Sequence, residues 1–482
     1  MNNQFTVNLL NKKDLVYSCL IVIAVGLLSS PQSWILGVGS LMSMVFVVYM
    51  LLRFIHSGDL MYACGLPSIA LTWIYFSAPC LYAKLPEYQG RIMPTEFLPE
   101  MAWYSNASVI ALCLGYLLTC NNNTIKPISH KYYKLSSEDI GRLVVVLLLV
   151  ALTQRLIWYY LPGMLDPLGQ LLVLLDFTPV LTVALGILYF LRGGRSVYLI
   201  SLVSVFFCFE VLLRISETLT SLLLYMIVAL VLVYVLERKK IPVIAIIVLF
   251  IVFFPIYNSK TIFRNEAVQR WHYQAEEDKA KIPELIPLGF SYLMKSYEIF
   301  EFENLFKDVQ KQGNSRFENI TYLGQCVYLV EYHDKPLKYG ESFWWLPFTV
   351  VPRIIFPWKP VNYQGTLMAS EYGLRNPFGH SAFNFPMLVE YYINFSFLGM
   401  VVLSFIQGMI MKWCLSKAAF GQGDINLLLL VCLLWDLVRV ESNITLVFGA
   451  MFHSIIIWWL LAKVLSFMSE SYRHSESQPA QL

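Results

Sequence analysis

Charged residues are scarce in this chain. Asp, Glu, Lys and Arg make up 14% of its 482 residues, against about 25% in soluble domains. Hydrophobic residues reach 57%, and the mean hydropathy is +0.59. This balance predicts an integral membrane protein, with the lipid bilayer as its surroundings. The net charge is only +3 and the basic residues are scattered, so we expect no nucleic-acid partner.

Metal and disulfide motifs are also missing. The chain has no CxxC pair, no Cys/His ligand spacing and no DxD-like motif in a loop, so we expect no metal and no cofactor. Of the nine cysteines, only Cys326 lies in the long loop between the apolar runs, residues 258–384. No disulfide partner is therefore available in that loop. An internal repeat is absent too, in contrast with many secondary transporters.

Long apolar runs are abundant. A membrane-spanning helix needs about 20 mostly apolar residues, and the runs predict an all-α integral membrane protein with about 12 transmembrane helices. The first run follows Lys12 and Lys13 without a cleavage site, so it is predicted to be retained. The expected spans are residues 14–30, 33–54, 59–82, 101–120, 141–161, 168–191, 197–213, 219–237, 241–257, 385–411, 424–440 and 443–467.

The positions of basic residues predict the orientation of these spans. Cytoplasmic connections carry an excess of Lys and Arg, and here alternate connections are basic. Both termini are therefore predicted to be cytoplasmic, with the long loop on the outer, periplasmic side of a bacterial inner membrane. The basic residues that support this orientation are Arg53, Lys126, Lys131, Lys134, Arg142, Arg192, Arg195, Arg238, Lys239, Lys240, Lys412 and Lys417.

The long loop divides the chain into four parts. We expect transmembrane helices 1–9 in residues 1–257, a periplasmic loop with short helices in 258–384, helices 10–12 in 385–468, and a cytoplasmic tail in 469–482. Within the loop, the apolar segment FWWLPFTVVPRIIFPW is broken by three prolines. Such a segment is predicted to be re-entrant or interfacial, because irregular backbone at membrane depth must line a cavity or lie within protein.

Several Lys and Arg residues fall on the predicted periplasmic side, although Lys and Arg are normally enriched on the cytoplasmic side. Arginine forms paired hydrogen bonds with phosphate and keeps its proton, so we expect these cations to bind an anion such as a pyrophosphate. The alternative is pairing with nearby carboxylates, and that alternative stays open. The candidate cations are Arg214, Lys260, Arg264, Arg353, Lys359, Arg375 and Arg439, and the candidate carboxylates are Glu210, Glu217, Asp436 and Glu441.

Two residues are candidates for moving a proton. His380 lies just before the tenth span, and Glu390 lies inside it. Transfer to a hydroxyl group needs a base or an orienting acceptor within hydrogen-bonding reach. The alternatives are a structural hydrogen bond for His380 and a buried arginine partner for Glu390.

These stretches resemble a known family, the Wzy-type polymerases of O-antigen and related bacterial surface polysaccharides. The resemblance covers roughly residues 205–450. It rests on LLRISET, KTIFR, PRIIFPWKP, FPMLVEYYINFSFLG and LVRVES. It implies a GT-C-like membrane architecture and a glycosyltransferase that needs neither a metal nor a nucleotide sugar.

The resemblance also implies a reaction and its partners. The growing chain would leave one undecaprenyl pyrophosphate carrier and join the sugar of another lipid-linked oligosaccharide, with a chain-length regulator as a further partner. Arg214, Arg264 and Arg353 would hold pyrophosphate, and His380 would orient or deprotonate the acceptor hydroxyl. Three alternatives remain: an O-antigen ligase that transfers polysaccharide to a lipid A core, a flippase for the lipid-linked oligosaccharide, and a cell-surface acyltransferase. The last usually has a histidine or a His/Asp pair in its early spans, and we expect none within the early spans predicted above.

Overall fold

The computed structural model describes most of the expected helices. Every regular element in the described residues is a helix, as the apolar runs predict. The described residues are 12–28, 34–57, 60–81, 98–119, 135–160, 175–216, 220–238, 242–249, 251–252, 255–256, 263, 282–299, 319–351, 356, 364–374, 384–420, 431–433 and 436–476. The named elements are α1 (Lys12–Leu28), α2 (Trp34–Ser57), α3 (Leu60–Phe76), η1 (Ala78–Leu81), α4 (Leu98–Leu118), α5 (Ser137–Tyr160), η4 (Leu175–Phe177), α7 (Thr178–Leu191), α8 (Val197–Ser216), α9 (Thr220–Arg238), α11 (Ile282–Ile299), α13 (Asn319–Tyr332), η7 (Glu341–Trp345), α14 (Leu346–Val350), α15 (Gln364–Glu371), α16 (Met387–Phe420) and α18 (Ile444–Glu476).

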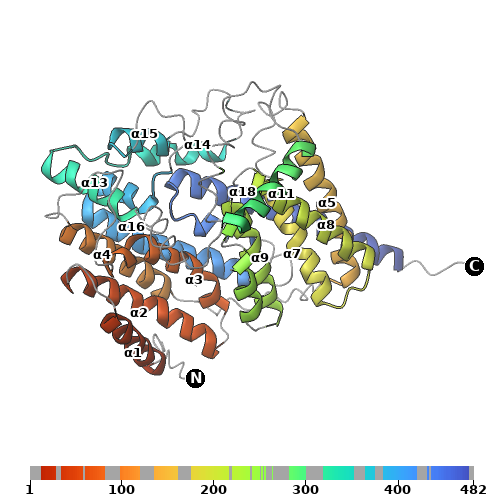
Figure 1. Ribbon diagram of the computed structural model, residues 1–482, viewed down its shortest axis with the longest axis horizontal. Helices are drawn as coiled ribbons and strands as arrows, with labels where there is room; N and C mark the ends of the chain where they lie inside the picture. The colour runs from red at the N-terminus through yellow and green to blue at the C-terminus, as the bar shows by residue number, and fades with distance from the viewer. Residues whose placement is uncertain are drawn as a thin grey trace, which may run out of the picture.

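The helices form two neighbouring groups (Figure 1). One group contains α1 to α4 and α16, and the other contains α5, α7, α8 and α9, with α11 packed against α8. In the first group, α4 and α16 pack with their backbones in close approach. A side chain at Gly115 or Gly408 would collide with a backbone carbonyl of the partner helix. Small residues at such crossings are typical of helix packing in membranes.

Five helices in the described residues are long and apolar enough to cross a membrane, and further apolar helices are shorter. The five are Gly37–His56, Glu100–Leu118, Ser137–Tyr160, Val197–Ser216 and Met387–Ser416. Apolar side chains also point outward: Leu27 is 80% exposed and Leu398 is 73% exposed. Lipid provides an apolar environment for such faces. The expected α-helical membrane architecture is therefore confirmed, whereas the count of 12 crossings stays a prediction.

Local signals explain where some helices begin. α5 begins at Ser137, four residues before the predicted span, because the Ser136 hydroxyl accepts a hydrogen bond from the Asp139 backbone N–H at 3.0 Å. A serine in this position supplies an acceptor for a free N–H of the first turn.

The expected spans 241–257 and 424–440 lie only partly within the described residues, where 243–249, 251–252, 255–256, 431–433 and 436–438 are helical.

The structure differs from the single tenth span predicted at 385–411. α16 is broken at Ser396, whose φ of 60° and ψ of −167° are not helical. The Tyr391 hydroxyl contacts Gln407 Oε1 at 3.3 Å. A straight helix would hold residues 16 positions apart at about 24 Å, so the chain folds back at this break. Residues 387–395 and 397–420 are therefore two arms of a helical hairpin, and the short arm does not cross a membrane by itself.

The helices of residues 319–371 gather at one end of the first group. Figure 1 shows α14 and α15 near the top, and α13 at the left edge above α16. α14 packs against α18, and α13 packs against α4 and α16. The Tyr392 hydroxyl of the short arm donates to Glu331 of α13 at 2.8 Å. These contacts place the short arm of α16 between the first helix group and the helices of residues 319–371.

Candidate functional site

A buried cluster of charges joins α5 and α8. Arg155 of α5 donates two hydrogen bonds to Glu210 of α8, from Nε to Oε1 at 2.8 Å and from a terminal nitrogen to Oε2 at 2.9 Å. Arg214, one turn further along α8, lies 3.6 Å from the same carboxylate, between Nε and Oε2. Glu210 is fully buried, and Arg155 and Arg214 are 3% and 7% exposed. Two guanidinium groups thus share one carboxylate.

This cluster gathers two guanidinium groups around one buried carboxylate. Charge in an apolar environment is costly unless a partner compensates it. Arg155 occupies both oxygens of Glu210 in a forked arrangement, which is the strongest geometry for this pair. Arg214 holds the longer contact to the same carboxylate.

A helix from the second half of the chain, α11, packs beside this cluster. α11 lies so close to α8 that a side chain at Gly289 would collide with the carbonyl of Leu212. Leu285 of α11 packs in one apolar cluster with Tyr159 and Leu213, the neighbours of the charged residues. α11 therefore shields the charged cluster from one side.

Apolar packing also brings a distant segment close to Arg214. Ile215, which follows Arg214, shares a buried cluster with Phe263 and Tyr292. The rings of Phe263 and Tyr292 stack with centroids 4.4 Å apart. Phe263 is the residue before Arg264 in the sequence, so the described neighbours of two predicted phosphate-binding arginines belong to one cluster.

Glu390 lies in the short arm of α16. Its Oε2 accepts a hydrogen bond from the backbone N–H of Ile444 at 2.7 Å, at the first residue of α18. The N-terminus of a helix carries partial positive charge and favours a carboxylate. The Ser342 side chain also faces this carboxylate, but Oε1 has no well-aligned hydrogen-bond donor in the described part of the chain. The described partner of Glu390 is thus a helix terminus, and the expected arginine partner is not found among the described residues.

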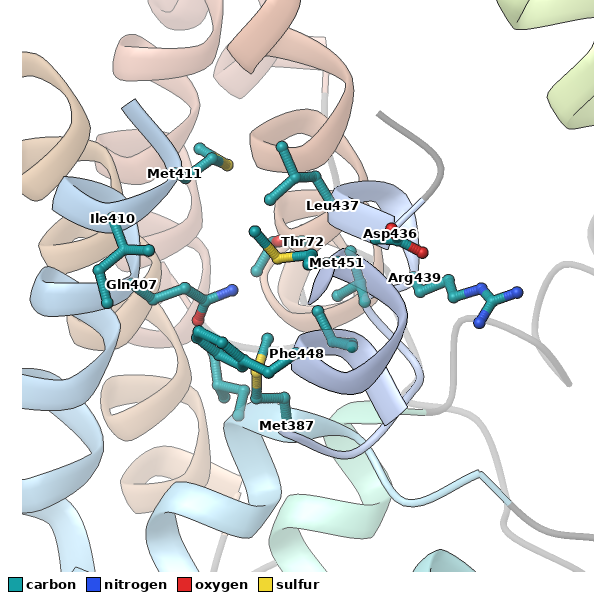
Figure 2. A pocket seen from close by; sticks show the side chains of 13 residues that line it. Thr72, Met387, Gln407, Ile410, Met411, Asp436, Leu437, Arg439, Phe448 and Met451 are labelled. Atoms are coloured by element: carbon teal, nitrogen blue, oxygen red, sulfur yellow. The ribbon is translucent and has the colours of Figure 1, made fainter. Parts of the chain in front are cut away.

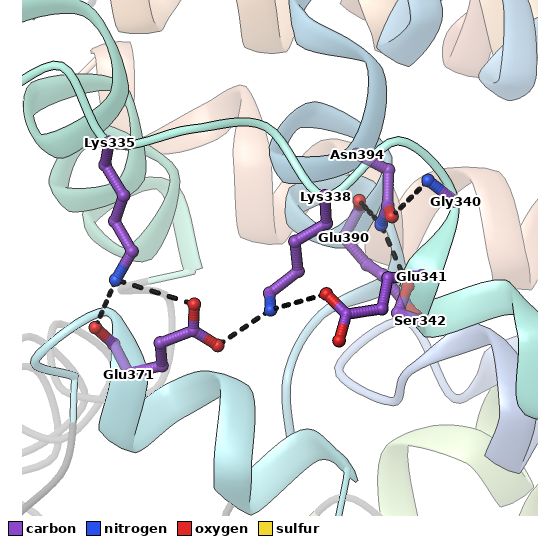
Figure 3. Close-up of polar contacts among 8 residues, drawn as sticks. All are labelled: Lys335, Lys338, Gly340, Glu341, Ser342, Glu371, Glu390 and Asn394. Carbon is purple, nitrogen blue, oxygen red and sulfur yellow. Dashed lines mark hydrogen bonds and ion pairs between the residues drawn. The ribbon is translucent and has the colours of Figure 1, made fainter.

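Asn394 fixes the break in α16 against the 319–371 helices (Figure 3). Its amide nitrogen donates to the Ser342 hydroxyl at 2.8 Å and to the Glu390 carbonyl at 2.7 Å, and its oxygen accepts from the Gly340 N–H at 2.9 Å. The break frees backbone carbonyls, and the N–H groups of Lys338 and Tyr339 bond those of Ile393 and Asn394. The hydrogen bonds that the helix loses are thereby replaced.

A cavity lies between α3, both arms of α16 and α18. Figure 2 shows Arg439 at its edge, with the guanidinium pointing away from the other lining residues. The cavity also borders Asp436, a fully buried carboxylate that accepts a hydrogen bond from Ser454 at 2.8 Å. Leu388, two residues from Glu390, lies in the same wall.

The structure describes three of the nine predicted site residues. Arg214 lies in the α5–α8 cluster, whereas Glu390 and Arg439 lie at the junction of α16 and α18, so the described cations do not form one group. The other predicted residues lie outside the described residues: Lys260, Arg264, Arg353, Lys359, Arg375 and His380.

Arg155 was not predicted from the sequence. The stretch TQRLIWYY places an arginine inside an apolar run, and an ionisable residue inside a span is itself a signal of function or of a buried partner. Its pairing with Glu210 joins helices 55 residues apart, which no local pattern shows.

Comparisons with protein families, with curated proteins and with solved structures find no match for this chain.

Proposed function

We propose that this protein is a metal-independent glycosyltransferase of a bacterial inner membrane. It polymerises undecaprenyl pyrophosphate-linked oligosaccharide repeat units into a surface polysaccharide at the periplasmic face. In this proposal both termini are cytoplasmic, and the 258–384 segment is periplasmic. The Wzy-like stretches LLRISET and FPMLVEYYINFSFLG are the basis for this choice of reaction.

The cluster of Arg155, Glu210 and Arg214 is the observation that carries the proposal. It gathers two guanidinium groups around one carboxylate in a buried site, and guanidinium groups form paired hydrogen bonds with pyrophosphate oxygens. Guanidinium groups arranged in advance stabilise the charge that develops on a leaving phosphate. Arg264, which lies outside the described residues, is the second arginine of this proposal because it follows Phe263, which packs against Ile215.

Glu390 is the described candidate for handling the acceptor hydroxyl. It is buried, and its Oε1 has no well-aligned donor in the described part of the chain, so Oε1 is the atom that would accept from a sugar hydroxyl in place of the Ser342 contact. The α18 N-terminus holds the other oxygen in place. His380 remains the second candidate for the same role, since a base must reach the hydroxyl directly or through one water.

A reconstituted transfer assay tests the proposal. Purified protein in liposomes receives a lipid-linked repeat unit, and the products are separated by size on a gel. A polymerase produces a ladder of glycans that stay on the lipid carrier. A product on a lipid A core acceptor alone would indicate the ligase, and movement of intact substrate across the bilayer without a ladder would indicate the flippase.

Variants separate the proposed roles. Arg214→Ala, Arg264→Ala and Arg353→Ala should abolish the ladder by weakening substrate binding, whereas Glu390→Gln and His380→Ala test proton transfer with binding retained. Arg192→Ala is the matched control. Arg192 also pairs with a carboxylate, Glu237, at 3.1 Å, but it caps α7 and precedes the start of α8 at Val197, which lies about 25 Å from Arg214 along α8. Its ladder should equal that of the wild type.

A further inference from the structure

The cavity beside Asp436 combines apolar walls with the polar side chains of Thr72, Gln407, Asp436 and Arg439. The Thr72 hydroxyl donates to the Ser68 carbonyl at 2.8 Å, and the Arg439 guanidinium points away from the other lining residues, so Asp436 and Gln407 are the two polar groups that face the cavity. Methionines line much of it, and their flexible thioether side chains adapt to an irregular guest. Figure 2 shows Asp436 and Gln407 on opposite sides, with Leu437 and Met451 between them. The methionines in its wall are Met387, Met411 and Met451.

The two polar groups offer one acceptor and one donor. Asp436 is fully buried; Ser454 donates to its Oδ2, and its Oδ1 has no hydrogen-bond partner in the described part of the chain. A buried acceptor in this state costs free energy until a ligand or water supplies a hydrogen. Gln407 accepts from Tyr391 through Oε1, so its amide nitrogen has hydrogens left to donate.

The size of the cavity limits what can enter. Its volume is about 30 Å³, which corresponds to roughly two water molecules. The Asp436 carboxylate disfavours a phosphate inside the cavity, and the guanidinium of Arg439, the cation in this lining, points away from it. An acylamino group matches all three features, with an N–H for Asp436, a carbonyl for Gln407 and a methyl group for the methionines.

We propose that this cavity binds the N-acetyl group of an amino sugar in the substrate. The inference rests on the proposed sugar transfer and adds a substrate class to it. The amide N–H donates to Asp436 Oδ1, the Gln407 amide nitrogen donates to the acetyl oxygen, and the methyl group contacts Met411 and Met451. A sugar with a hydroxyl in place of the acetamido group loses the apolar contact and one of the two hydrogen bonds.

Saturation-transfer NMR with a matched pair of disaccharides tests this inference. Di-N-acetylchitobiose and cellobiose differ in their acetamido and hydroxyl groups, and the method detects weak binding and the protons in contact. We expect the acetyl methyl protons to receive the strongest saturation from the full-length protein in detergent. Cellobiose should give a signal at least about threefold weaker, as the loss of one hydrogen bond predicts.

Two methionine variants provide the control. Met411→Phe fills the cavity and should remove the methyl signal, whereas Met409→Phe, on the same helix but 39% exposed, should keep it. Gln407→Leu, which leaves the volume nearly unchanged, should weaken the signal by about three- to tenfold. Equal signals for both disaccharides, or an unchanged methyl signal in Met411→Phe, would overturn the inference. Binding of a polyprenyl pyrophosphate is measured separately and reports on the arginine cluster, so failure of one site is distinguished from failure of the other.

Discussion

At the scale of single residues, the unusual feature is one carboxylate shared by two buried guanidinium groups. Glu210 forms two hydrogen bonds with Arg155 and a longer contact with Arg214. Removing one partner of a buried ion pair costs much more than the pair contributes, because it leaves an uncompensated charge in an apolar environment. Glu210 is therefore as important to the stability of this region as to the binding of an anion.

Glu210→Gln should destabilise the protein by about 3–5 kcal/mol. The change keeps the shape of the side chain but removes the negative charge that the two arginines share. The free energy of unfolding in detergent measures the effect, with Glu138→Gln as the control because Glu138 pairs with Arg142 on the surface. Equal stability of the two variants would show that Glu210 does not carry this charge balance.

Residue-level reasoning from the sequence identifies part of this site. An arginine near the outer end of a predicted span marks Arg214, and a carboxylate within the tenth span marks Glu390. The partners of these residues are not predictable, because they depend on which helices pack together. Arg155 and the N-terminus of α18 become their neighbours only through tertiary contacts.

At the scale of elements, the break in α16 determines the geometry around Glu390. Ser396 adopts a positive φ that favours glycine. The loop at 338–340 and Asn394 hold this conformation by replacing the lost helical hydrogen bonds. The sequence predicts an uninterrupted span here because NFSFLG contains no proline, and only the surrounding contacts produce the turn.

Ser396→Gly should stabilise the protein by about 1 kcal/mol, since it removes the backbone strain of a non-glycine residue in this region. The control is Ser416→Gly in the long arm of the same helix, which should lose about 0.5 kcal/mol because glycine weakens a regular helix. Unfolding in detergent compares the two variants. If both lose stability, the hairpin conformation at Ser396 is wrong.

A chain of charges holds α15 against the loop before η7. Lys338 lies 2.8 Å from Glu371 and 3.4 Å from Glu341, and Lys335 also contacts Glu371 (Figure 3). Burial lowers the pKa of Lys338, but its hydrogen bond to Glu371 and the nearby negative charges outweigh this effect, so the pKa is raised above 10.5. A raised lysine pKa means that its stabilising contribution is complete below 10.5 and is lost as the pH rises through the raised value.

Glu371→Gln should therefore increase hydrogen exchange in residues 364–374, and the difference from the wild type should stay constant between neutral pH and about pH 9. Exchange measured by mass spectrometry and corrected for the intrinsic pH dependence provides the test. A difference that shrinks between these two pH values would show that the lysine does not hold α15 through its charge.

At the scale of the whole molecule, the helical membrane class follows from composition alone. Apolar runs longer than about 18 residues are strong signals, and α2, α4, α5 and α8 lie within or close to the predicted spans. The packing within each helix group is not encoded in any single run. It depends on close crossings such as Gly115 with Phe405 in the first group and Gly289 with Leu212 in the second.

The orientation of the molecule can be tested with single cysteines. Tyr339→Cys, at a side chain that is 77% exposed, should react with a membrane-impermeant maleimide in spheroplasts whose inner membrane is intact. Arg195→Cys, in the turn between α7 and α8, should react only after the membrane is opened. The opposite pattern would reverse the proposed topology and place the candidate site in the cytoplasm.

Binding of a short-chain polyprenyl pyrophosphate tests the central claim most directly, because that claim is that the α5–α8 charge cluster holds this group. The affinity of purified protein should fall by about tenfold or more in Arg214→Ala, as the loss of a charged hydrogen bond predicts, and should stay unchanged in Arg192→Ala. Thermal unfolding of both variants verifies that they are folded. Unchanged affinity in a folded Arg214→Ala variant, or an equal loss in both variants, would contradict the account.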